Sequence, residues 1–114
     1  MSRDIGTAME LKALNFLRKQ GLELLQRNFN TRMGEIDLIM TDQDTLVFIE
    51  VRYRQNQNYG SALESVNFTK QQKLIKTAQY FLQTQKHYQK LHCRFDVIAF
   101  SKDNNRPEWI RSAF

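Results

Sequence analysis

Hydrophobic and polar positions recur along this chain with two periods, which divide it into predicted helices and strands. Apolar residues recur at helical spacing over residues 6–20 and again over residues 69–85. Five segments have the alternation or the composition of strands: 22–28, 34–41, 46–53, 93–100 and 108–114. The order is α-β-β-β-α-β-β, which predicts an α/β domain with a mixed central β-sheet flanked by helices.

The second and third strands are predicted to form a hairpin around a polar turn, residues 42–45. An even-numbered loop centred between Gln43 and Asp44 sorts the side chains best, because an odd-numbered loop mixes apolar and polar residues on each face. One face then carries apolar pairs and is expected to be core: Met40–Val47, Leu38–Ile49 and Ile36–Val51. The other face carries three further pairs: Ile39–Phe48, Asp37–Glu50 and Glu35–Arg52.

The predicted register sets two carboxylates opposite each other, with the Cβ atoms of Asp37 and Glu50 about 4.5–5.5 Å apart. Like charges repel in this position, and the cost falls if the pair shares a proton or holds a cation. Mg²⁺ takes oxygen ligands, and the backbone carbonyl of Val51 offers a further oxygen. The pair therefore indicates a metal site built on strands. A solvated sheet face, with both carboxylates pointing to water, is the alternative.

Two other charged residues are predicted to lie close to this pair. Glu10 lies beside the apolar stripe of the first helix, so it either faces the sheet or is an ordinary surface glutamate. Arg52 follows Glu50 by two residues and shares its face. An ion pair between Arg52 and Glu35 across the strands is its alternative role.

The charge distribution favours an anionic partner. The formal net charge is +5 and the isoelectric point is about 9.6, as in many nucleic-acid-binding domains. No acidic residue lies between Ser65 and Phe95. The candidate phosphate-binding residues are Arg54 and three lysines on the polar side of the second helix: Lys70, Lys73 and Lys76. An ordinary solvated helix face has the same pattern. Three aromatic residues either stack on bases or pack: Tyr53, Tyr59 and Phe68.

A length of 114 residues predicts one domain spanning residues 1–114. The lone Cys93 cannot form an intramolecular disulfide, and no cluster of residues suggests a zinc site. The first residues lack the pattern of a signal peptide, and no apolar run approaches the ~18 residues that span a bilayer. A cytoplasmic protein outside the membrane is therefore expected. The polar segment 55–65 is long enough for a functional loop or a short helical turn.

Two motifs, GEIDLI and FIEVRYR, place twelve residues between Asp37 and Glu50. This arrangement resembles the D-x(n)-E-x-K signature of restriction-endonuclease-like nucleases. Glu10, the pair Arg27–Asn28, the lysine-led second helix and the motif RFDV at 94–97 extend the match, so that nearly the whole chain resembles the YraN-like family of small bacterial proteins. The resemblance implies the fold of Holliday-junction resolvases. It also implies an endonuclease dependent on Mg²⁺ or Mn²⁺ that hydrolyses DNA, with branched or damaged DNA among its expected substrates.

The resemblance also implies roles for individual residues. Asp37, Glu50 and the carbonyl of Val51 would hold the metal, and Glu10 would reach it directly or through water. Arg52 stands where the signature has lysine, and this is a departure from the pattern. An arginine stays protonated, so it can hold a phosphate or stabilise charge but cannot act as a base.

Three functions are left open by these observations. The first is a nuclease in which the metal activates water and Arg52 clamps the phosphate. The second is a nucleic-acid-binding module on a nuclease fold that cuts slowly or not at all, and the third is a structural domain without a nucleic-acid role. Resolvase-like enzymes use two active sites on symmetric junctions, which suggests a homodimer by analogy. No heptad or apolar interface stripe in the chain demands one.

Overall fold

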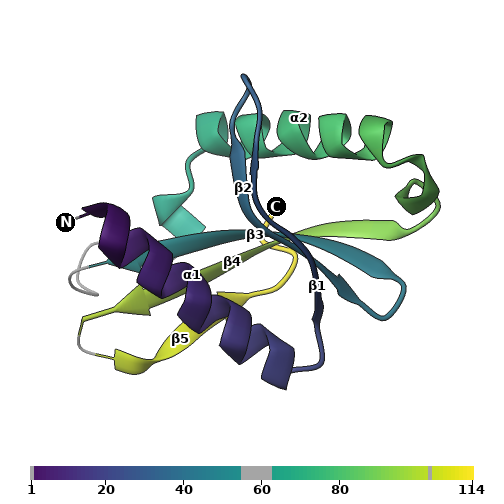
Figure 1. Ribbon diagram of the computed structural model, residues 1–114. Helices are drawn as coiled ribbons and strands as arrows, with labels where there is room; N and C mark the ends of the chain where they lie inside the picture. Colours follow the sequence, from purple (N-terminus) through teal and green to yellow (C-terminus); the bar gives the residue numbers. More distant parts are fainter. Residues whose placement is uncertain (1, 55–62, 103) are drawn as a thin grey trace.

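The fold is a mixed five-stranded sheet with one long helix packed on each face (Figure 1). The computed structural model describes residues 2–54, 63–102 and 104–114. The strands follow the chain order within the sheet: β1 (Glu23–Asn30), β2 (Glu35–Asp42), β3 (Thr45–Arg54), β4 (His92–Ser101) and β5 (Asn104–Ile110). Strands β3 and β4 are parallel, and the other neighbours are antiparallel.

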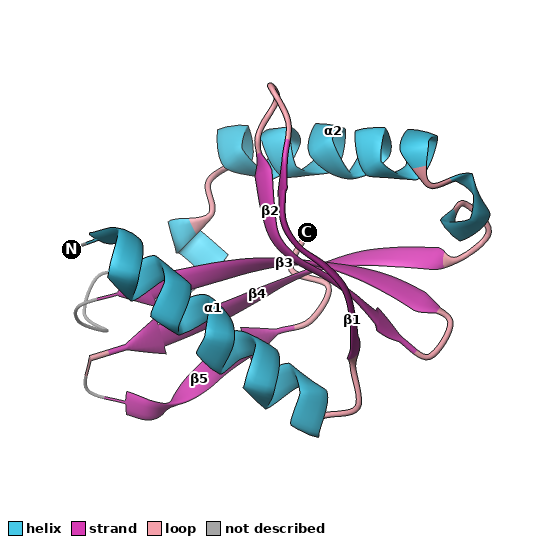
Figure 2. Ribbon diagram, viewed as in Figure 1, coloured by secondary structure: helices cyan, strands magenta, loops and turns pink. Residues whose placement is uncertain are grey.

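The helices complete the predicted order α-β-β-β-α-β-β, which is confirmed (Figure 2). The long helices are α1 (Ser2–Lys19) and α2 (Phe68–Thr84), and two short 3₁₀ helices are η1 (Leu63–Ser65) and η2 (Lys86–Tyr88). Within the described part of the chain, neither long helix is apolar enough over a sufficient length to cross a membrane.

Most element boundaries lie within a few residues of the predicted ones, and the last strand differs most. Strand β5 covers residues 104–110 rather than 108–114 because the chain turns at Ser112, whose φ is 49°. Helix α1 ends where predicted, next to Gly21 with φ 98°, a conformation that glycine adopts without strain. Of the polar segment 55–65, residues 63–65 form η1, and residues 55–62 lie outside the described part.

Two hydrophobic clusters lie on opposite faces of the sheet, and strand β3 supplies both of them. Val47 and Ile49 pack with α1, whereas Leu46 and Phe48 pack with α2. The sheet is therefore buried on both faces over this strand. By the same alternation Glu50 follows Phe48 on the α2 side, so the face that carries it is a second core and not a solvated surface.

The β2–β3 hairpin has the predicted register near its turn and departs from it further along. Three pairs confirm the predicted loop: Asp42–Thr45, Met40–Val47 and Leu38–Ile49. Beyond Leu38 the prediction is wrong, because the pairing of β2 with β3 ends there, and the observed partner of Ile36 is Phe29 of β1 on the other edge of β2. Ile36 consequently packs in the cluster on the α2 side. Strand β2 thus leaves β3 and continues with β1 as a two-stranded hairpin next to α2 (Figure 1).

Candidate metal centre

The candidate site lies where β2 leaves β3. The predicted backbone pairs of Asp37 with Glu50 and of Glu35 with Arg52 are outside the observed pairing, which stops at Leu38. Instead, the Asp37 side chain bridges the two strands, because its Oδ2 accepts the N–H of Val51 at 2.8 Å. A carboxylate oxygen thus takes the place of a backbone acceptor, and the strands separate without leaving this buried N–H unpaired.

Asp37 and Glu50 are nevertheless close enough to interact strongly. Burial, and after it the negative charge of Glu50, raises the pKa of Asp37 to about 9. A hydrogen bond between the two carboxyl groups acts in the same direction, and the N–H of Val51 opposes it. Burial and the charge of Glu50 thus favour the protonated form of Asp37.

Two cations contact the other member of the pair. Glu50 is only 6% exposed, and its Oε2 lies 3.0 Å from Nζ of Lys70 and 3.7 Å from NH1 of Arg52. Among the described residues, no lysine or arginine forms an ion pair with Asp37. The cationic contacts of the pair therefore go to Glu50, whereas Asp37 accepts the N–H of Val51.

A third and a fourth carboxylate complete the acidic group. Glu10, Glu35 and Asp37 each place one oxygen within 4.8 Å of the others. Glu10 extends from α1 and lies 3.9 Å from NH2 of Arg27 on β1, so it faces the sheet rather than solvent. Burial raises the pKa of Glu10, and the charge of Arg27 opposes that shift.

These carboxylates fit a hard divalent cation. Mg²⁺ and Mn²⁺ bind oxygen ligands, and two oxygens on one octahedral Mg²⁺ are about 3–4 Å apart. The oxygens of Glu10, Glu35 and Asp37, all within 4.8 Å of one another, are grouped closely enough to surround one such cation. One oxygen of Glu10, Oε1, is buried without a hydrogen-bond partner among the described residues, as expected for an atom that takes up a ligand.

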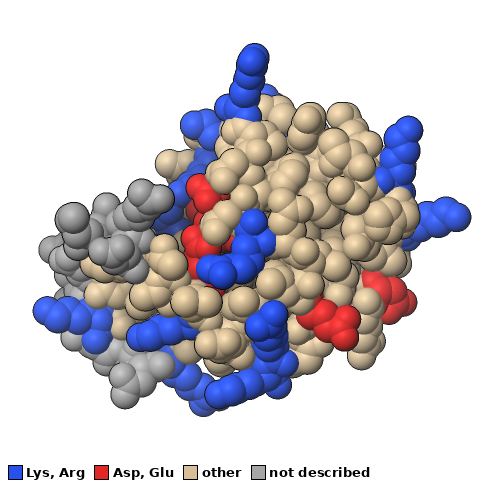
Figure 3. Space-filling view, in the orientation of Figure 1, with Lys and Arg blue, Asp and Glu red and all other residues tan. Residues whose placement is uncertain are grey.

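The carboxylates open into a cavity of about 290 Å³ that is acidic on one side and basic on the other. Its lining comes from β2, β3, α2 and the turn before β2: Gly34, Glu35, Asp37, Glu50, Val51, Arg52, Lys70, Lys73 and Leu74. Figure 3 shows acidic side chains gathered between α1 and α2, with lysine and arginine side chains around them. Such a cavity suits a cation together with an anion.

The predicted phosphate-binding residues divide into two groups. Lys70 and Lys73 line the cavity, whereas Lys76 is exposed further along α2. Arg54 is directed elsewhere, because its NH2 lies 3.7 Å from Glu108 of β5.

The predicted aromatic candidates are accessible where they are described. Phe68, the first residue of α2, is 72% exposed, and Tyr53 is 39% exposed. Both residues are therefore available for stacking. Tyr59 lies outside the described residues.

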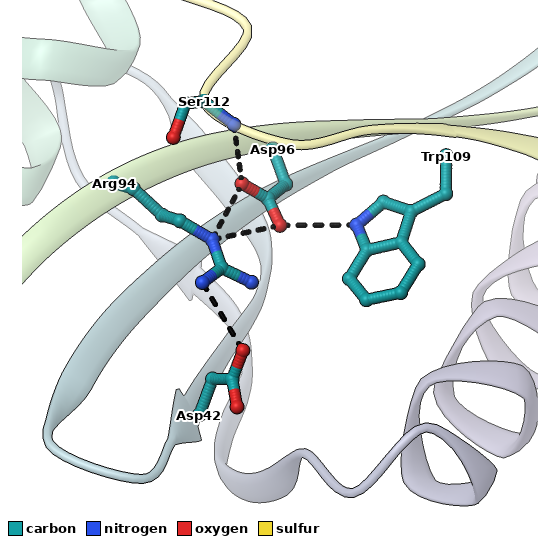
Figure 4. A network of polar contacts seen from close by, with 5 residues as sticks. All are labelled: Asp42, Arg94, Asp96, Trp109 and Ser112. Carbon is teal, nitrogen blue, oxygen red and sulfur yellow. Dashed lines mark hydrogen bonds and ion pairs between the residues drawn. The ribbon is translucent and has the colours of Figure 1, made fainter.

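The motif RFDV serves the framework and not the cavity. Asp96 is 1% exposed and accepts hydrogen bonds from Arg94, from Nε1 of Trp109 and from the N–H of Ser112, each at 3.0 Å at the closest (Figure 4). The same arginine reaches Asp42 at 3.1 Å. This network joins β4 to β5, to the end of the chain and to the β2–β3 turn.

Comparison with known proteins places the chain in a family. The profile of the uncharacterised protein family UPF0102 matches residues 9–100. The chain belongs to the UPF0102 family. The UPF0102 protein of Psychromonas ingrahamii is 49% identical over 113 residues, which cover 99% of this chain and 91% of the relative. That of Stutzerimonas stutzeri is 50% identical over 115 residues, with 99% and 96% covered, and that of Pseudomonas fluorescens is 47% identical over 109 residues, with 96% and 91% covered.

Membership of UPF0102 confirms the family that the motifs indicated, and the family description names no activity. The matched range contains every residue of the acidic cavity. Two features of this cavity were missed from the sequence. Glu35 belongs to the acidic group, and its spacing of two residues from Asp37 on one strand was the available signal. The contact of Lys70 with Glu50 joins two elements and has no signal in the strand pattern.

Proposed function

We propose that this UPF0102 protein is a divalent-metal-dependent nuclease that hydrolyses phosphodiester bonds in DNA, with branched or damaged DNA as its substrates. The observation that carries the proposal is the cavity itself, which is lined by three carboxylates, Glu35, Asp37 and Glu50, and also by two lysines, Lys70 and Lys73. A phosphodiester bound to metal ions needs both halves of this arrangement, oxygen ligands for the cation and cationic groups for the phosphate.

The chain's own residues supply binding and orientation. Asp37, Glu35 and Glu10 would hold the cation, with Glu50 and the carbonyl of Val51 as further ligands. When bound, a cation of this kind acidifies water and withdraws charge from the phosphate. Hydrolysis forms a bond from a water oxygen to phosphorus and breaks the bond from phosphorus to a sugar oxygen. The water loses one proton and the departing oxygen takes one up.

Arg52 suits the role of a phosphate clamp. Its NH1 lies 3.7 Å from Glu50, which is beyond a hydrogen bond, and its buried Nε has no hydrogen-bond partner among the described residues. A guanidinium with unused N–H donors beside a cavity can donate two parallel hydrogen bonds to two oxygens of a phosphate. Arg52 would therefore hold a nonbridging oxygen of the bound phosphodiester.

Cleavage of a four-way DNA junction and of linear duplex DNA in Mg²⁺ or Mn²⁺ tests the proposal. We expect wild-type cleavage, and a loss of about 10²-fold or more in kcat for Asp37→Asn and for Glu50→Gln. Asp44→Asn, an exposed aspartate in the β2–β3 turn, is the matched control. Unchanged cleavage by both site variants would show that any activity comes from elsewhere.

Arg52 also favours a second candidate, a DNA-binding module without cleavage, because the signature of active nucleases has lysine at that position. Salt-dependent binding of the same DNA with no cleavage in either metal would support this candidate over the nuclease. Sedimentation of the protein with and without the junction would show whether two copies act together, as symmetric junctions require.

A further inference from the structure

A lysine does reach this site, from a different element. Lys70 of α2 places its Nζ 3.0 Å from Oε2 of Glu50, closer than any atom of Arg52 that pairs with the same oxygen. Lys70 also lines the cavity together with Asp37. Two cations therefore contact Glu50: Arg52, which stands where the signature has lysine, and Lys70, which comes from α2.

The backbone of Lys70 is held in place by a helix cap. Asn67 caps α2, and its Oδ1 accepts the N–H of Lys70 at 2.9 Å. Lys70 is therefore in the first turn of the helix, where its side chain extends toward β3. The side chain is 41% exposed, so the amine is accessible to a ligand that enters the cavity.

We propose that Lys70 is the catalytic lysine of this site, where its ammonium orients the attacking water and stabilises charge on the phosphate while Arg52 clamps the phosphate. This inference rests on the proposed nuclease function. An ammonium has three N–H donors, and the contact with Glu50 uses one of them. The other two hold the attacking water and a nonbridging oxygen of the phosphate, on which negative charge grows.

The water oxygen bonds to phosphorus while the bond from phosphorus to the sugar oxygen breaks. The proton of the water passes to solvent, and the departing sugar oxygen takes a proton from solvent. Lys70 keeps its own proton throughout. Arg52 holds the phosphate, so the two cations divide the work that one lysine performs in the signature motif.

Moving the lysine tests this assignment. The variants are Lys70→Met, which keeps the length of the side chain and removes its charge, and Lys70→Met combined with Arg52→Lys. Lys86→Met, in η2 at the far end of α2, is the control for loss of one positive charge. Cleavage of a four-way DNA junction gives kcat and KM, and binding of the same junction in Ca²⁺ gives affinity without relying on cleavage.

We expect Lys70→Met to lower kcat about 10²-fold, with KM and the affinity in Ca²⁺ changed less than about threefold. Adding Arg52→Lys to Lys70→Met should raise kcat at least about tenfold. A merely structural role for Lys70 does not explain such a recovery. Equal unfolding midpoints of the variants in urea exclude a folding defect.

Other results would overturn the assignment of Lys70, and each of them also shows whether the proposed nuclease function stands. Wild-type cleavage that Lys70→Met leaves unchanged, or a loss that appears only in affinity, removes Lys70 from catalysis and leaves the nuclease in place. Cleavage by Arg52→Lys alone, with wild type inactive, shows that Lys70 does not substitute for the missing lysine. Inactivity of wild type and Arg52→Lys in both metals rejects the nuclease, and the assignment with it.

Discussion

Asp37 accepts the backbone N–H of Val51 at 2.8 Å across the point where β2 and β3 separate, and this one contact both shapes and charges the site. It lets two strands part without an unsatisfied buried N–H, and it fixes a carboxylate inside the resulting cavity. The strand separation is therefore tied to the same side chain that would hold a metal. Asparagine keeps the acceptor and removes the ability to ionise, so Asp37→Asn separates the hydrogen bond to Val51 from the charge that a metal would need.

The first prediction concerns stability against pH without metal. Because the pKa of Asp37 is raised from 3.8 to about 9, the folded protein binds a proton more tightly than the unfolded chain. Its contribution to stability is complete below about pH 4 and is lost as pH rises toward about 9. The free energy of unfolding should fall over this window, by at most about 1.4 kcal/mol per pH unit for one proton.

Urea unfolding in EDTA at pH 5 and pH 8 measures this effect. Asp37→Asn should exceed wild type in stability by much more at pH 8 than at pH 5, because asparagine resembles the protonated acid and most of the window from about pH 4 to about pH 9 lies above pH 5. Asp44→Asn, in the exposed turn, should follow wild type at both pH values. If Asp37→Asn and wild type have parallel pH profiles, the carboxyl at position 37 is not held protonated.

Alternation of apolar residues predicted the hairpin register correctly from the turn as far as Leu38, where β2 pairs with β3 on one edge and with β1 on the other. From the turn to Leu38 and Ile49 the pattern and the register agree, because a shift of one residue would expose the core on both strands. Beyond Leu38 the strand β2 leaves β3 and keeps β1 as its partner, with Ile36 opposite Phe29. The pattern of two strands sets their register but does not show the residue at which they separate.

The sequence named the carboxylates Asp37, Glu50 and Glu10 of the candidate site and the cations Arg52, Lys70 and Lys73. It missed the place of Glu35 in the acidic group and the contact of Lys70 with Glu50. Asp37 and Glu50 were recognised because charges interrupt apolar strands, and Glu10 because it borders an apolar stripe. The position of Lys70 depends on how α2 packs over β3, since helical periodicity places the lysine on a polar side without saying what lies opposite. Arg54 was expected to bind phosphate but pairs with Glu108. The sequence pattern could not show this contact, because Glu108 lies on β5, far along the chain.

The second prediction concerns which carboxylates bind the metal. If the cation lies among Glu10, Glu35 and Asp37, Glu35→Gln should weaken Mn²⁺ binding at least about tenfold, as should Asp37→Asn. Titration calorimetry of the protein without DNA measures the affinity. Glu64→Gln, at an exposed position in η1, is the matched control. A loss in Glu50→Gln with none in Glu35→Gln would place the cation between Asp37 and Glu50 instead.

The third prediction concerns the buried network around Asp96. Asp96→Asn removes the buried charge that pairs with Arg94, and it leaves this half-buried cation with only Asp42. We expect the free energy of unfolding to fall by roughly 3 kcal/mol, as for other buried pairs that lose one partner. Trp109 is the only tryptophan and donates to Asp96, so its fluorescence reports the change during urea unfolding. A loss below about 0.5 kcal/mol would show that the network is dispensable.

The fourth prediction concerns the contact that holds the β1–β2 hairpin next to α2. A Cβ added at Gly34 would lie 3.2 Å from Oγ1 of Thr77, and φ at Gly34 is 158°, which L side chains rarely adopt. Gly34→Ala should therefore destabilise the protein by about 1–2 kcal/mol. Thr77→Ala removes the contacting oxygen but also its hydrogen bond to the carbonyl of Lys73, so it carries a cost of its own.

Urea unfolding of the two single variants and the double variant separates these effects. If the clash is real, the double variant should be more stable than the sum of the single losses by about 0.5–1 kcal/mol. The backbone strain at position 34 is present in Gly34→Ala and in the double variant, so removing the Thr77 oxygen recovers only part of the lost stability. Additive losses would mean that the hairpin moves away from α2 freely, and its position would then not define the wall of the cavity that Gly34 lines.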